Sequence, residues 1–172
     1  PTVLPKGGRV WFFAYFAAIG TGFIFVEIAF MQKFVLLLGS PLYSISVTLC
    51  ALLISSGLGS RASACFFRDS RPILSAVPVL SLAVLASVLL FNGIGASWIQ
   101  SAIHFPFVGR IATCVGLMAP IGFLMGMFFP SGLRLMGQHH GGAVAWAWGI
   151  NSGFTVLGST LTIILAQFNG FS

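Results

Sequence analysis

Charged residues are scarce in this chain, and acidic residues are the scarcest of all. Only 6% of the 172 residues are charged, and only Glu27 and Asp69 are acidic. A soluble domain needs roughly a quarter of its residues charged, so this composition excludes a soluble globular domain. The lipid bilayer must therefore be the main solvent, and we expect an integral membrane protein.

The sequence also lacks patterns that carry chemistry. The residues of metal-binding type other than the two acids are Cys50, Cys65, Cys114, His104, His139 and His140. They show neither a CxxC pair nor another metal-ligand spacing, and neighbouring histidines point in different directions. No glycine loop follows a strand, and no His–Asp pair accompanies a hydroxyl nucleophile. We predict no catalytic residue, no metal site and no cofactor.

The basic residues argue against a nucleic-acid partner. The net charge is +6, but Lys and Arg occur singly at the ends of apolar runs, without interleaved aromatic residues. This placement is typical of residues that orient a protein in a membrane.

Five apolar segments are long enough to cross a bilayer. They are residues 10–38, 42–58, 72–91, 107–129 and 143–168. We predict an all-α bundle of these five helices, forming a single transmembrane domain over residues 1–172. The turn Gly39-Ser40-Pro41 should end the first span and Pro130 the fourth. We expect a loop over residues 92–106, with a short interfacial helix at "SWIQSAI".

The distribution of Lys and Arg predicts the orientation. With five spans, six of these eight residues fall on one side of the membrane, and only Lys33 and Arg110 lie toward the other. The positive-inside rule then places the N-terminus in the cytoplasm and the C-terminus outside. We expect a multi-pass protein of the bacterial inner membrane.

Small residues indicate how the spans pack, because helices in lipid associate through close backbone approach. GxxxG patterns occur at Gly122 and Gly126 and again at Gly149 and Gly153. Ala18 and Gly22 form a related pair. We expect these residues to pack helices within the chain, and a homodimer seam is the alternative.

Tryptophans mark the expected membrane interfaces. Trp98 lies in the predicted loop, and Trp146 and Trp148 open the fifth span. Such positions are typical of interface anchors. A contact with a bound lipid or pigment is the alternative for these aromatic residues.

Glu27 lies inside "GFIFVEIAFMQKFVLLLG", within the first span. A lone carboxylate at the bilayer centre costs from about 3 to more than 10 kcal/mol, so Glu27 should face protein and be protonated or paired. Lys33 is six residues further on and points to another face. Arg110 is the better candidate partner.

Other polar groups are alternative partners for this carboxylate. The hydroxyl and amide candidates are Ser44, Ser46, Thr48, Asn151 and Thr155. We predict an intramembrane polar site made of Glu27, Gln32, Lys33, Arg110 and Asn151. It acts either as a structural clamp between helices or as a proton or cation site.

Three long stretches resemble one family. They are "YFAAIGTGFIFVEIAFMQKFVLLLGSPLYSISVTLCALLISSGLGS", "GFLMGMFFPSGLRLM" and "AWAWGINSGFTVLGSTLTIILA". Together they resemble the membrane region that follows the synthase domain in bacterial membrane-bound spermidine-synthase-like proteins. In that family the synthase domain binds S-adenosylmethionine or its decarboxylated form and transfers an aminopropyl group. No residue here matches that domain, so the resemblance implies no catalytic residue.

Three functions follow as hypotheses. The first is a non-catalytic membrane anchor or accessory subunit, whose partners are membrane lipids and other membrane protein subunits. The second is a protein that handles polyamines or other cations through Glu27. The third is the membrane half of a spermidine-synthase-like enzyme whose catalytic domain is absent from this chain.

Overall fold

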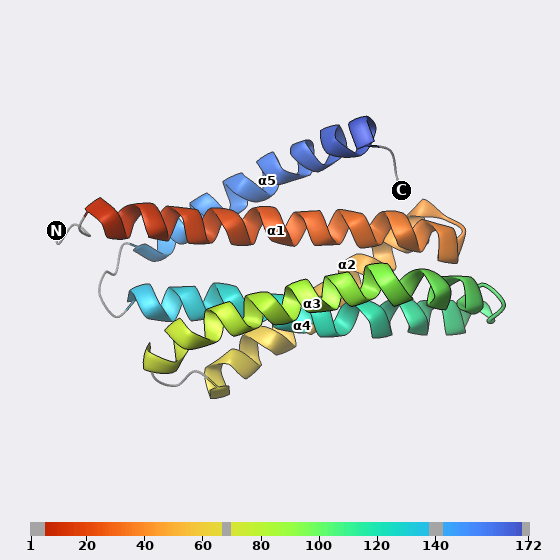
Figure 1. Cartoon of the computed structure of the whole chain (residues 1–172), viewed down its shortest axis with the longest axis horizontal. Coiled ribbons are helices and arrows are strands. Elements are labelled where there is room, and N and C mark those ends of the chain that lie inside the picture. The colour runs from red at the N-terminus through yellow and green to blue at the C-terminus, as the bar shows by residue number, and fades with distance from the viewer. Residues whose placement is uncertain (1–5, 67–69, 138–142, 170–172) are drawn as a thin grey trace. The chain divides into compact units, whose positions relative to one another are not determined.

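The protein is all-helical in the part that the structure describes. The computed structural model describes residues 6–66, 70–137 and 143–169, and it contains no strand there (Figure 1). The helices are α1 (Lys6–Leu38), α2 (Pro41–Phe66), α3 (Ser70–Ala102), α4 (Phe107–Gly137) and α5 (Ala143–Asn169). The all-α class predicted from the sequence is confirmed.

Four of these helices are long and apolar enough to cross a membrane. The spanning segments are Val10–Leu38, Pro41–Phe66, Phe107–Arg134 and Val144–Leu165. The first of them has the bounds predicted from the sequence. Helix α3 contains a shorter apolar stretch, Val77–Phe91.

The connection between α1 and α2 lies where the sequence predicted it. Gly39 has a φ of +74°, and its amide donates to the Val35 carbonyl at 2.9 Å. A left-handed glycine directly after a helix satisfies a carbonyl that the helix end leaves open. Pro41 then starts α2, where its missing amide costs nothing.

Three helices continue past the ends predicted for them. Helix α2 extends beyond Leu58 to Phe66, and α4 runs through Pro130 to Gly137. Helix α3 covers most of the expected loop and ends at Ala102. The hydropathy of a sequence reports where a helix leaves the hydrocarbon, whereas helical hydrogen bonding can continue into the interface. Proline removes only one backbone donor, so Pro130 did not end α4.

The chain divides into two compact units. Unit 1 consists of residues 1–28 and 131–172, and unit 2 consists of residues 29–130. Helices α1 and α4 therefore contribute to both units.

In unit 1, the end of α4 and helix α5 contact the first part of α1. A Cβ added at Gly132 of α4 would overlap the Tyr15 ring of α1. The rings of Phe13 on α1 and Phe154 on α5 meet edge to face, with centroids 5.3 Å apart. Figure 1 shows α5 crossing α1 and then leading away from it.

In unit 2, the four contributing helices enclose a core of large side chains. Phe34, Leu37, Leu52, Cys114 and Met118 are almost fully buried. Ser44 at the start of α2 donates its hydroxyl to the Met31 carbonyl of α1 at 2.5 Å. This bond ties the two helices together beside their connecting turn.

Candidate functional site

Glu27 lies on the face of α1 that contacts α5. A Cβ added at Gly20 of α1 would overlap the Asn151 carbonyl oxygen of α5. The Thr155 hydroxyl of α5 donates to that carbonyl at 2.8 Å and reaches the Gly20 carbonyl at 3.4 Å. Seven residues correspond to about 700° of helix, so Glu27 faces the same way as Gly20.

The described residues show no hydrogen bond between the carboxylate of Glu27 and the amide of Asn151, and a joint site stays a prediction. Glu27 lies roughly 10 Å along α1 from the Gly20 contact, given a rise of about 1.5 Å per residue. Glu27 is half-buried, and the described residues of unit 1 give it no hydrogen bond or ion pair. The side-chain Oδ1 of Asn151 is also buried without a partner among the described residues.

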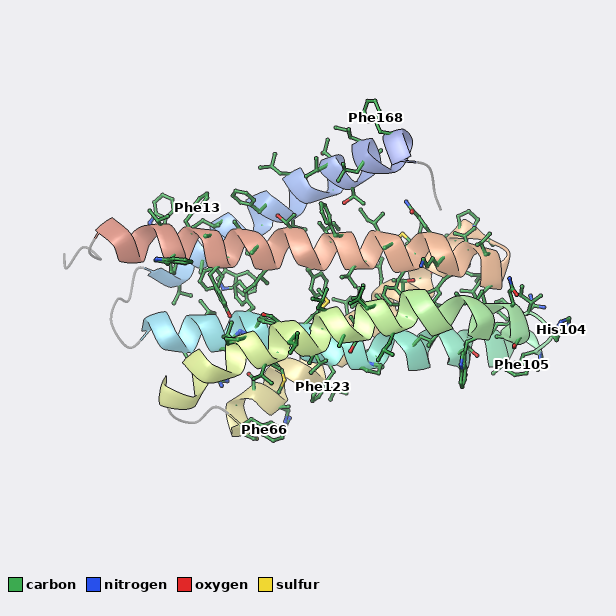
Figure 2. The ribbon with its side chains drawn as sticks, viewed as in Figure 1. Phe13, Phe66, His104, Phe105, Phe123 and Phe168 are labelled. Carbon is green, nitrogen blue, oxygen red and sulfur yellow. The ribbon has the colours of Figure 1, made fainter. Side chains whose placement is uncertain are left out.

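Arg110 holds together three chain segments at one end of unit 2. Its Nη2 donates to the Ile103 carbonyl at 2.6 Å, its Nε to the Phe105 carbonyl at 3.1 Å and its Nη1 to the Leu37 carbonyl at 3.4 Å. Figure 2 shows Phe105 and His104 at this end. The guanidinium thereby satisfies carbonyls at the ends of α1 and α3. Its pairing with Glu27, which belongs to unit 1, stays a prediction.

Lys33 lies against an aromatic cluster. Its Nζ is 5.2 Å from the centroid of the Phe91 ring of α3. Phe91 also packs on Phe30 and Phe34 of α1, with centroid distances of 4.2 and 6.4 Å. A cation over a ring contributes about 0.5–1 kcal/mol at an exposed position and more when desolvated. The neighbouring Gln32 is half-buried and has no polar partner among the described residues of unit 2.

The first glycine pair lies where α2 and α4 meet. A Cβ added at Gly122 would overlap the Ser55 hydroxyl, and one added at Gly126 would overlap the Ser56 backbone. From the side of α2, a Cβ at Gly59 would overlap the carbonyl oxygen of Phe123. Sequence reasoning missed Gly59, although the "GLGS" stretch that contains it was a signal of small residues. These glycines allow the two backbones to approach closely.

The second glycine pair faces open space in the part of the chain that the structure describes. A Cβ added at Gly149 or Gly153 would meet nothing within 4 Å, and both residues are exposed. A Cβ added at Gly22 would also meet nothing within 4 Å. On α1 it is Gly20, two residues earlier, that contacts α5. The three predicted interface anchors, Trp98, Trp146 and Trp148, are all exposed.

Metal-binding residue types stay apart in the described part of the chain. No three His, Cys, Asp or Glu side chains come together there in a way that could hold a metal ion. Cys50 and Cys65 are exposed and Cys114 is buried, and all three are free thiols.

Comparison with known proteins adds no relative. No family model matches the chain, and neither a curated protein nor a solved structure matches it. The resemblance to the membrane region of spermidine-synthase-like proteins therefore stays a prediction from the sequence.

Proposed function

We propose that this chain is a non-catalytic integral membrane subunit that packs within a larger membrane complex. We further propose five spans with a cytoplasmic N-terminus in a bacterial inner membrane, where the apolar stretch of α3 provides part of the fifth span. The observation that carries the proposal is the unpacked state of α5. Of its spanning window only 6% is buried, whereas 22–33% is buried in the other three candidate spans.

The open face of α5 has the residue types that membrane helices use to associate. Gly149 and Gly153 lie about one turn apart on it, with no described residue within 4 Å of an added Cβ, and Ser152 is exposed beside them. Lipid solvates apolar side chains well, so they do not drive helices together. Small residues contribute attraction only when another backbone comes close. A partner helix on this face would use them.

Glu27 gives a second, independent support. It is half-buried without a partner among the described residues of its own unit, and an unpaired carboxylate in hydrocarbon costs several kcal/mol. A donor from an associated subunit would remove this cost. We therefore propose that Glu27 acts as a clamp in the assembled complex.

Site-directed cross-linking in native membranes tests the proposal. Exposed cysteines Cys50 and Cys65 are replaced by Ser, and a single cysteine is introduced by Gly153→Cys. The matched control is Gly57→Cys on α2, which is also an exposed glycine with nothing within 4 Å. We expect a thiol cross-linker to join position 153, but not position 57, to a second protein identified by mass spectrometry. Cross-links confined to one chain, together with purification of the chain alone in mild detergent, would contradict the proposal.

A further inference from the structure

Residues of α2 and α4 line a groove between the two helices. The groove has a volume of about 350 Å³. Its walls include Val47, Cys50 and Ile54 on α2 and Ile111, Val115 and Ala119 on α4. We propose that this groove binds one acyl chain of a membrane phospholipid, whose phosphate group lies beside Arg110.

The glycine contact between the helices creates the groove. Gly59, Gly122 and Gly126 bring the two backbones together at one end. Toward the starts of α2 and α4, the rings of Tyr43 and Phe107 meet, with centroids 5.1 Å apart. The groove is the wedge-shaped space between these two contacts.

The length of the wedge fits an acyl chain from one leaflet. On α4 the lining runs from Ile111 to Ala119, and on α2 it runs from Ser46 to Leu58. At about 1.5 Å per residue these stretches are ~12 and ~18 Å long. Half of a typical hydrocarbon core is ~15 Å. Both stretches begin about one turn after the starts of their helices. If the helix starts lie in the headgroup layer, the lining therefore begins where the hydrocarbon begins.

A whole helix does not fit inside the groove. A volume of about 350 Å³ spread over ~15 Å corresponds to a cross-section of ~20–25 Å². A helix with its side chains is about 10–12 Å across and needs several times this area. A single hydrocarbon chain is the slender apolar group that a bilayer supplies.

The walls of the groove are apolar and therefore suit an apolar ligand. Ser55 is the buried polar residue of the lining, and its hydroxyl donates to the Ala51 and Leu52 carbonyls of its own helix at 2.5 and 3.3 Å. It therefore presents no open donor to a ligand. A polar ligand would lose hydrogen bonds to water in this groove without regaining them.

A positive charge lies next to the start of the lining on α4. Arg110 directly precedes the lining residue Ile111 and is half-buried. Its three hydrogen bonds go to neutral carbonyls, and no acidic residue is among the described residues of unit 2. A guanidinium has five N–H donors, so two are available for a phosphate oxygen.

Lipid retention by the purified full chain tests the acyl site. The protein is extracted in mild detergent, and bound phospholipid is counted by native mass spectrometry. Ala119→Phe fills the groove, and Ala86→Phe adds the same bulk at an exposed position of α3. We expect one retained phospholipid per chain in the wild type and in the control, and roughly tenfold lower occupancy in Ala119→Phe with unchanged helix content. Equal occupancy in both variants would overturn the proposal.

Competition on the wild-type protein tests the phosphate contact without any mutation. Delipidated protein is offered phosphatidylglycerol or a diacylglycerol with the same chains. We expect retention of phosphatidylglycerol over diacylglycerol, and Arg110→Gln should abolish the preference. Equal retention of the two lipids by the wild type would refute the role given to Arg110.

Labelling of Cys50 distinguishes a lipid from a protein in the groove. In a Cys65→Ser background Cys50 is the exposed thiol, since Cys114 is buried. Added phosphatidylglycerol should slow its reaction with bimane. Cross-linking of Cys50 to a second protein in native membranes would show a protein occupant and overturn the lipid proposal.

Discussion

Replacement of Gly59 by Ala should push α2 and α4 apart. An added Cβ at this buried position would lie within 3.1 Å of the Cα, the carbonyl carbon and the carbonyl oxygen of Phe123. All three are backbone atoms, so no side-chain rotation can relieve the overlap. The helices must separate by roughly 1 Å, which forfeits a quarter to a half of the dispersion energy of neighbouring atom pairs.

Two opposing contributions set the size of this effect. Overpacking in a tight contact costs about 1–3 kcal/mol, whereas Ala in place of Gly favours a helix by up to about 1 kcal/mol. Gly57→Ala on the same helix gains the second contribution without the first, because its Cβ would meet nothing within 4 Å. The two variants should therefore differ in free energy of unfolding by about 2 kcal/mol, or roughly 30-fold in the unfolding equilibrium constant.

The assay is reversible unfolding in mixed micelles. Helix content is followed by circular dichroism while the mole fraction of SDS is raised, for the wild type and for the Gly59→Ala and Gly57→Ala variants. We expect only Gly59→Ala to unfold at a lower SDS fraction. If Gly59→Ala is as stable as Gly57→Ala, the backbone contact between α2 and α4 does not exist as described.

Three further predictions concern polar and aromatic residues. Arg110→Leu should lower the stability of the detergent-solubilised chain by about 2–3 kcal/mol in thermal unfolding, because it removes three carbonyl contacts; full rescue by Arg110→Lys would contradict the need for a guanidinium fork. A double-mutant cycle of Lys33→Met and Phe91→Leu should show a coupling of about 0.5–1 kcal/mol, and zero coupling would rule out the cation–ring contact. Glu27→Leu should leave the isolated chain at least as stable as the wild type, because it removes an unpaired carboxylate, but it should lower the yield of co-purified partner subunits. An isolated chain strongly destabilised by Glu27→Leu would instead place the partner of Glu27 within the chain.

The sequence predicted the helices better than it predicted their ends. Apolar runs and the Gly39-Ser40-Pro41 turn mark α1 and the start of α2 clearly, because glycine adopts the left-handed conformation there and proline starts the next helix. The ends of α2, α3 and α4 were placed too early. Residues such as Ser60 and Arg61 are polar, but they hydrogen-bond in a helix as readily as apolar residues do. Hydropathy therefore cannot locate the last helical turn outside the hydrocarbon.

Glycine spacing predicted which helix faces are smooth, but not which helix covers them. Gly122 and Gly126 meet α2, whereas Gly149 and Gly153 have the same spacing and meet nothing within the described chain. A GxxxG pair describes one surface only, and its neighbour depends on the tertiary arrangement. For the same reason Gly59 contacts Phe123 without belonging to any such pair.

The predicted polar site could be named from the sequence, but its contacts could not. The sequence did not predict that Arg110 donates to carbonyls near its own helix start; its pairing with Glu27 stays a prediction. Unpaired carbonyls at helix ends are strong acceptors that composition does not reveal. The contact of Lys33 with the Phe91 ring was not predicted either, because the position of that ring depends on how α3 packs on α1.

Topology labelling in sealed cells tests most directly whether these helices cross a membrane. Cys65 near the end of α2 is exposed, as is His104 after α3. Two proteins are compared in a background where Cys50 is replaced by Ser: one retains Cys65, and the other carries Cys65→Ser with His104→Cys. A membrane-impermeant maleimide should label position 104 in intact cells and position 65 only after permeabilisation. Labelling of both positions from outside, or release of the protein by alkaline carbonate without detergent, would contradict the account.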